Sequence, residues 1–160
     1  MDARPFDRID LAAVLPDLTE DEASRIRRAA ARIDVPEPAP GRSGWTWFPN
    51  RVAPDGIRWV IFGIEFVYRT SMHDAIGFNL HVSREEPPRL AVAISIDVDC
   101  WCDQDHNMHE VHSQSWLVGT AAAFTDAFES ATVALASWLA GSHEPSIYRA
   151  AAGLPNPPVQ

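Results

Sequence analysis

A long stretch of alternating apolar and polar residues, from residue 45 to residue 118, constrains the fold more than any other feature of the chain. Side chains of a β-strand point alternately to opposite faces, so a period of two is typical of strands with one buried face. Short segments rich in turn-forming residues interrupt this pattern, which predicts an antiparallel meander. We expect four or five strands, in the segments 45–48, 57–70, 76–82, 90–101 and 108–118.

Two segments with helical periodicity flank the predicted sheet. In residues 20–33 the apolar residues recur at helical spacing, and Thr19 and Glu22 have the spacing of a capping box. In residues 120–140 the apolar residues form one stripe, and Gly141 follows as a stop signal. We therefore expect one amphipathic helix before the sheet in the sequence and one after it.

The remaining segments join these elements into one unit. A proline-rich connector at 34–44 leads from the first helix to the sheet, and a partly irregular tail is expected at 141–160. The pattern predicts a two-layer α+β fold, in which an N-terminal and a C-terminal helix pack on the antiparallel sheet. A length of 160 residues suits a single domain over 1–160.

Charge and hydropathy narrow the classes of function. The net charge of −9, from 22 acidic and 13 basic residues, argues against nucleic-acid binding, which requires clustered positive charge. No apolar run approaches the ~20 residues of a membrane helix, and the first residues lack the apolar core of a signal peptide. We therefore expect a cytoplasmic protein without membrane association. The spacing of Cys100 and Cys102 disfavours a disulfide, in keeping with reduced thiols.

The segment 97–112, DVDCWCDQDHNMHEVH, holds two cysteines, three histidines and five acidic residues in sixteen positions. One hypothesis is a zinc site, because thiolates and imidazoles are the ligands that zinc prefers. A second hypothesis is a hard-cation site made of carboxylates. A third is that the polar residues are solvated and the cysteines are small buried apolar side chains. The zinc ligands would be Cys100, Cys102, His106 and His109, and the carboxylates would be Asp97, Asp99 and Glu110.

A symmetric hairpin around the turn at 102–107 predicts how this segment pairs. We expect residue 101 opposite 108, 99 opposite 110 and 97 opposite 112, because that register turns Val111 and Leu117 toward the core. The same register places Asp97, Asp99, Glu110 and His112 on the outer face of the sheet, and it places Cys100 opposite His109 on the inner face.

Large aromatic residues accompany the acidic ones, since the chain has six tryptophans. Trp59 and Trp101 are expected on the outer face, and Trp45 and Trp47 share one side of an edge strand. Tryptophan is enriched among residues that anchor protein interfaces. The predicted partner-binding residues are therefore Trp45, Trp47, Trp59, Asp97, Trp101, Asp99, Glu110 and His112.

No nucleophile or phosphate-binding motif is found in the sequence, and "TSMHDA" at 70–75 is interpreted as a turn rather than a catalytic triad. We expect a non-enzymatic module that binds a protein partner through the outer sheet face, with no cofactor. A basic protein is one candidate for this partner. The alternative is a metal-binding protein or metal-dependent enzyme with zinc at 97–112, and a homodimer through the sheet face or an edge is a further alternative. In size, acidity and lone α+β sheet, the chain resembles toxin-neutralising immunity proteins and small secretion chaperones, a resemblance of general style that assigns no residues.

Overall fold

The computed structural model describes residues 15, 17–33, 44–50, 60–71, 74–85, 89–102 and 107–158, and at 44–50, 60–62 and 107 it describes only the backbone. Its strands form one sheet in which each strand pairs antiparallel with its neighbour in sequence. The predicted meander is thus confirmed. The strands are β1 (Gly44–Asn50), β2 (Val60–Ser71), β3 (Asp74–Arg84), β4 (Leu90–Cys100) and β5 (Asn107–Val118).

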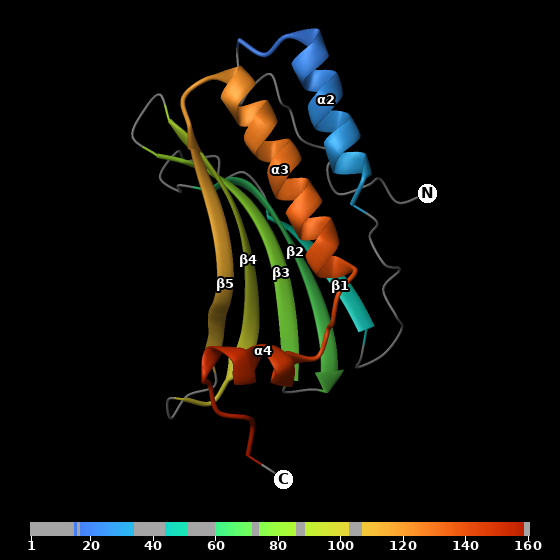
Figure 1. Ribbon diagram of the computed structural model, residues 1–160, viewed down its shortest axis with the longest axis vertical. Coiled ribbons are helices and arrows are strands. Elements are labelled where there is room, and N and C mark those ends of the chain that lie inside the picture. The colour runs from blue at the N-terminus through green and yellow to red at the C-terminus, as the bar shows by residue number, and fades with distance from the viewer. Residues whose placement is uncertain are drawn as a thin grey trace.

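The helices of the described residues lie on one side of this sheet (Figure 1). They are α2 (Glu20–Ala31), α3 (Ala121–Leu139) and α4 (Pro145–Ala152). Helix α3 runs diagonally across the sheet, α2 packs beside α3, and α4 crosses one end of the sheet. The two-layer α+β class is confirmed. None of the helices found in the described residues has the length and apolar character needed to cross a membrane.

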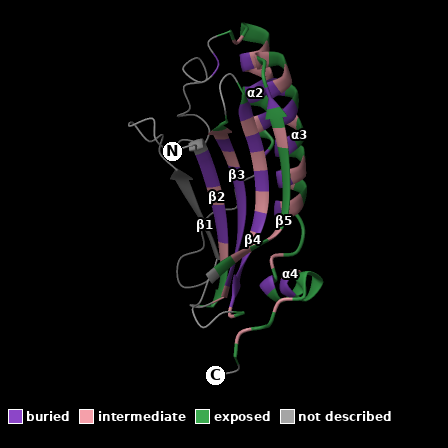
Figure 2. Cartoon of the chain, turned by 90° about the vertical axis from the view of Figure 1, so that its left-hand side faces the viewer, coloured by how far each residue is buried: buried purple, intermediate pink, exposed green. Residues whose placement is uncertain are grey.

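The core lies between α3 and the inner sheet face. Along β4 the residues alternate between buried and half-buried, as the period of two predicted (Figure 2). Phe78 and Leu80 of β3 are completely buried, as are Phe124 and Leu135 of α3. Full burial of such a side chain contributes about 1.5–3 kcal/mol to the free energy of unfolding. The contact between the apolar stripe of α3 and the inner sheet face is therefore the main stabilising element of the fold.

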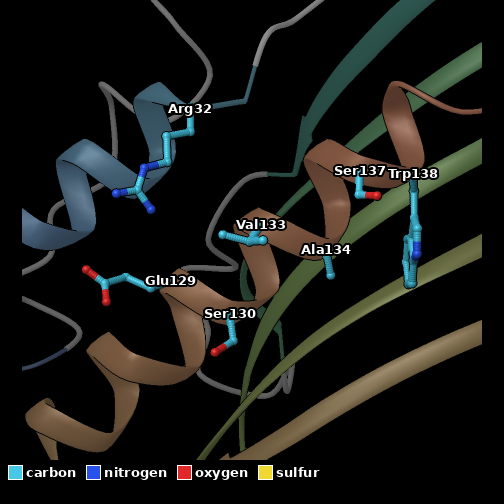
Figure 3. Close-up of a pocket in the computed structure, with 7 residues that line it drawn as sticks. All are labelled: Arg32, Glu129, Ser130, Val133, Ala134, Ser137 and Trp138. Carbon is cyan, nitrogen blue, oxygen red and sulfur yellow. The ribbon is translucent and has the colours of Figure 1, made fainter.

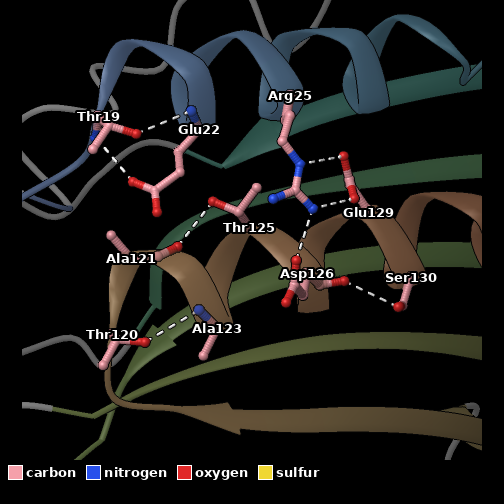
Figure 4. A network of polar contacts seen from close by, with 10 residues as sticks. All are labelled: Thr19, Glu22, Arg25, Thr120, Ala121, Ala123, Thr125, Asp126, Glu129 and Ser130. Carbon is pink, nitrogen blue, oxygen red and sulfur yellow. Dashed lines mark hydrogen bonds and ion pairs between the residues drawn. The ribbon is translucent and has the colours of Figure 1, made fainter.

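The start of α2 forms as its sequence predicts. The Thr19 side chain accepts a hydrogen bond from the Glu22 amide at 3.2 Å, and the Glu22 carboxylate accepts one from the Thr19 amide at 2.9 Å (Figure 4). This capping box satisfies two amides that the first helical turn leaves without partners. Arg25 then joins α2 to α3 through ion pairs of 2.7 Å with Asp126 and Glu129.

The pairing of β4 with β5 differs from the predicted register. Asp97 lies opposite Glu110, and beyond it Ile96 lies opposite His112, so Val111 is an extra residue in a β-bulge. A bulge shifts the alternation by one residue. Leu117, predicted to face the core, is therefore on the outer face with 56% of its surface exposed.

This register error has a physical reason. A regular strand in the predicted register would turn Val111 and Leu117 inward. With the bulge, Trp116 lies opposite the buried Val92 and packs against the core, and Val111 also keeps contact with the core. The bulge thus replaces a leucine with the larger tryptophan on the inner face, which buries more apolar area.

Helix α4 lies in the tail, where the sequence analysis expected a partly irregular chain. Pro145 occupies its first turn, where a missing amide costs nothing, and Gly153 ends the helix at φ 70°. Arg149 is buried beneath the helix and is 1% exposed. The contacts of this arginine determine where α4 attaches to the sheet.

Candidate metal centre

Three of the four predicted zinc ligands converge at the end of the β4–β5 pair. One donor atom from each of Cys100, Cys102 and His109 lies within 4.8 Å of the others. Both cysteines are free thiols, and Cys100 is buried while Cys102 is exposed. The fourth predicted ligand, His106, lies outside the described residues. The cluster is therefore accessible from solvent on the Cys102 side and closed by the core on the Cys100 side.

The fold brings these residues together through the ends of two strands. Cys100 is the last residue of β4, and the chain bends at Cys102, so the second sulfur turns back toward the strand. His109 stands near the start of β5 opposite Val98, on the same face as Cys100. The predicted pairing of Cys100 with His109 is wrong, since Cys100 lies opposite Asn107. The donors nevertheless meet because the bend moves Cys102 toward the histidine.

The distances within the cluster match those between ligands of one ion. The Cys102 sulfur lies 3.0 Å from Nε2 of His109 and 3.9 Å from its Nδ1. Tetrahedral zinc, with its usual Zn–S and Zn–N bond lengths, holds a sulfur and a nitrogen ligand about 3.5 Å apart. The two observed distances lie on either side of this value. A small rotation of the imidazole ring would therefore suit coordination.

The Cys100 sulfur is hydrogen-bonded within the same segment. It accepts a hydrogen bond from the backbone amide of Cys102 at 3.2 Å. The chain bend that presents Cys102 thus also orients a donor toward Cys100.

Arg149 holds the segment on both sides of Cys100. One of its Nη atoms donates to the backbone carbonyl of Asp99 at 2.9 Å, and its guanidinium carbon lies 5.9 Å from the ring centre of Trp101. The same guanidinium donates to both carboxylate oxygens of Asp74, and its Nε donates to Asn156. The sequence analysis missed Arg149 and Asp74. The available signal was a lone arginine within the apolar tail segment at 147–154.

The carboxylates proposed for a hard cation are not equivalent in the structure. Asp97 and Glu110 lie opposite each other on the outer face. Asp99 lies opposite Met108 and is only 3% exposed. Of the described His, Cys, Asp and Glu residues, the group with donors close enough to share an ion is the Cys–His cluster, which does not include these carboxylates.

The outer face around Asp97 carries half-buried ionisable groups. Burial raises the pKa of Asp97, and the nearby Glu110 charge raises it further, while hydrogen bonds from Ser95 and Asn79 oppose the change. Burial and the charge of Asp97 raise the pKa of Glu65 on β2. The charged forms of Asp97 and Glu65 are thus less favourable than in water, because their negative charges are incompletely solvated.

The predicted partner-binding residues do not form one exposed outer surface. His112 lies on the helix side, where its ring is 5.0 Å from that of Trp138, because the bulge changed the alternation. Asp99 is buried, and Trp101 is half-buried beside Arg149. Trp59 lies outside the described residues, and Trp45 and Trp47 belong to β1, of which only the backbone is described.

Comparison with known proteins adds no further assignment to this geometry. No known protein family, no curated protein and no solved structure matches the chain.

Proposed function

We propose that the protein binds a divalent transition-metal ion, with zinc as the preferred ion, through Cys100, Cys102 and His109. The observation that carries this proposal is the convergence of the three donor atoms within 4.8 Å. Two thiolates and an imidazole favour zinc over magnesium or calcium, which prefer oxygen ligands.

Three protein ligands leave one position of a tetrahedral ion for another group. A closed structural site would take a fourth protein ligand, for which His106 is the residue predicted from the sequence. A catalytic site would keep water or substrate there. Replacing His106 with glutamine separates the two cases: a large loss of zinc affinity supports the closed site, and an unchanged affinity supports an open one.

The first experiment measures metal content directly. Protein produced without a histidine tag, with zinc in the medium, is expected to contain about one zinc per chain by elemental analysis. Cobalt added to the metal-free protein should produce a thiolate-to-cobalt charge-transfer band. Folded protein that retains no zinc and gives no cobalt band contradicts the proposal.

Single substitutions then assign the ligands. His109→Gln is expected to lower zinc affinity by more than the ~10–100-fold typical of losing a residue outside the first coordination sphere. His112→Gln is the matched control, because His112 is on the same strand and face but contacts Trp138 instead. Cys100→Ser and Cys102→Ser should each weaken the cobalt band, because each variant removes one of the two thiolates. Equal affinities for the two histidine variants would remove His109 from the site.

A protein-interaction module remains a second proposal. The observation that favours it is the placement of Asp97 and Glu110 side by side on the outer face, as expected for docking of a basic partner. Capture of a basic protein from a cell lysate should fall in the Asp97→Ala, Glu110→Ala double variant. Substitution of Ser113 and Ser115, on the same face, serves as control. Equal capture by both variants would count against this function.

A further inference from the structure

The two edges of the sheet differ in how well they resist pairing with another strand. The β1 edge has seven residues and includes Pro49, which lacks an amide donor. The β5 edge has twelve residues, and β4 pairs with one side of it along its whole length. Within the described part of the chain, no strand pairs with its other side. Proteins usually protect such edges with charged residues, prolines or bulges. In β5 these are confined to Glu110 and the bulge at Val111, so residues 112–118 contain none of them.

The surface beside this edge is uncharged, which is unusual for a chain of net charge −9. Residues 111–125, in β5 and the start of α3, contain no Asp, Glu or Arg, and neither do residues 130–142 of α3 and its end. The fold places the two stretches together, since His112 contacts Trp138. A second copy of this acidic chain would meet least repulsion on this side of the molecule.

We propose that the β5 edge pairs with the β5 edge of a second copy of the chain, antiparallel and about a twofold axis at Gln114. In two antiparallel strands, the side chains of residues directly opposite each other lie on the same face of the sheet. Inner-face residues of one copy therefore pair with inner-face residues of the other. Centring on Gln114 places Trp116 of one copy opposite His112 of the other on the inner face. On the outer face it places Ser113 opposite Ser115. Aromatic and hydroxyl side chains each meet a matching group.

Strand pairing alone buries less than the ~1,200–2,000 Å² of a stable interface, so a second contact is needed. A groove of about 670 Å³ along α3 can supply it (Figure 3). Its lining combines the charged side chains of Arg32 and Glu129 with Ser130, Val133, Ala134, Ser137 and Trp138, and 55% of Val133 is exposed. A twofold axis perpendicular to the sheet places both α3 helices on the same side of the joined sheet. The part of α3 around Trp138, which contacts His112 of β5, therefore lies on the side where the copies meet.

The test uses opposite charges at the twofold axis. Sedimentation analysis of the full chain is expected to show a dimer, with reducing agent and chelator present so that neither disulfides nor metal link the copies. Gln114→Glu and Gln114→Lys should each raise the dimer dissociation constant about tenfold or more, because like charges then meet at the axis. An equimolar mixture of the two variants should restore dimers. Ala31→Glu, on the exposed face of α2, is the charge control.

Three outcomes overturn the proposal. A wild-type chain that stays monomeric at all concentrations has no such interface. A dimer that is unaffected by either Gln114 variant uses another surface, and so does one in which the mixture fails to recover. Because the measurement is made with chelator, a failed metal site and a failed dimer give different results.

Discussion

Two arginines fasten helices to the rest of the molecule, and they do so in opposite surroundings. Arg25 links α2 to α3 and Arg149 links α4 to the sheet, and each has an ion pair of 2.7 Å. The Arg25 side chain is 31% exposed, whereas that of Arg149 is 1% exposed. Distance alone therefore says little about what each contact contributes, and burial decides the difference.

Each arginine compensates for its surroundings differently. Hydrogen bonds to Glu129 and then to Asp126 raise the pKa of Arg25, and the bond to Arg25 lowers the pKa of Glu129. Water and salt screen these exposed charges, so their net contribution is small. Arg149 has lost its water and instead donates to Asp74, Asn156 and the Asp99 carbonyl. Removing any one of these partners would leave the buried charge incompletely compensated, which would destabilise the fold.

The largest expected effect comes from removing the buried cation. Arg149→Met should lower the free energy of unfolding by about 3–5 kcal/mol, because the variant leaves Asp74 and the Asp99 carbonyl without their donor. Urea denaturation followed by circular dichroism measures this change. A loss of stability smaller than that of Thr19→Ala would show that the buried contact of Arg149 contributes no more than an exposed one.

Removing the buried anion should have the next largest effect. Asp74→Asn keeps the shape of the side chain but withdraws its charge from Arg149, and the expected loss is about 2–3 kcal/mol. Combined with Arg149→Met, the two losses should not add, because each variant already breaks the same contact. If the two losses of stability simply add in this double-mutant cycle, Asp74 and Arg149 do not stabilise the fold through a shared contact.

At the α2 end the helix cap should matter more than the ion pairs. Thr19→Ala removes the hydroxyl that accepts from Glu22 and is expected to cost about 1 kcal/mol. Thr19→Ser keeps the hydroxyl and serves as the matched variant. Thermal denaturation of both should show a lower midpoint for the alanine variant alone.

The smallest expected effect belongs to Arg25. Arg25→Gln should lower stability only slightly at neutral pH, and 0.5 M salt, roughly, should erase most of the difference from wild type. Since the folded-state pKa of Glu129 lies below its ordinary value, the wild-type contribution is complete above that ordinary value. It is lost as the pH falls through the folded-state pKa. Denaturation curves across this acidic range should therefore converge for wild type and variant.

The candidate site shows where inference from sequence stops. Ligand chemistry alone selected Cys100, Cys102 and His109, and the structure brings all three together. The strand register proposed for them was nevertheless wrong: Cys100 lies opposite Asn107 instead of His109, and a bulge at Val111 reverses the alternation only beyond the site. Arg149 was missed because a lone arginine in an apolar tail segment does not reveal its partner until the distant Asp74 is placed beside it.

Local patterns in the sequence were sufficient for the elements themselves. The capping box at Thr19, the apolar stripe of α3 and the alternation of β2 to β4 depend on residues within one or two turns or strand repeats, so they could be recognised along the chain. Tertiary structure alone decided the register at β5, the side on which His112 lies and the burial of Arg149. Those features depend on which residues compete for the same space in the core and on contacts between residues far apart in sequence.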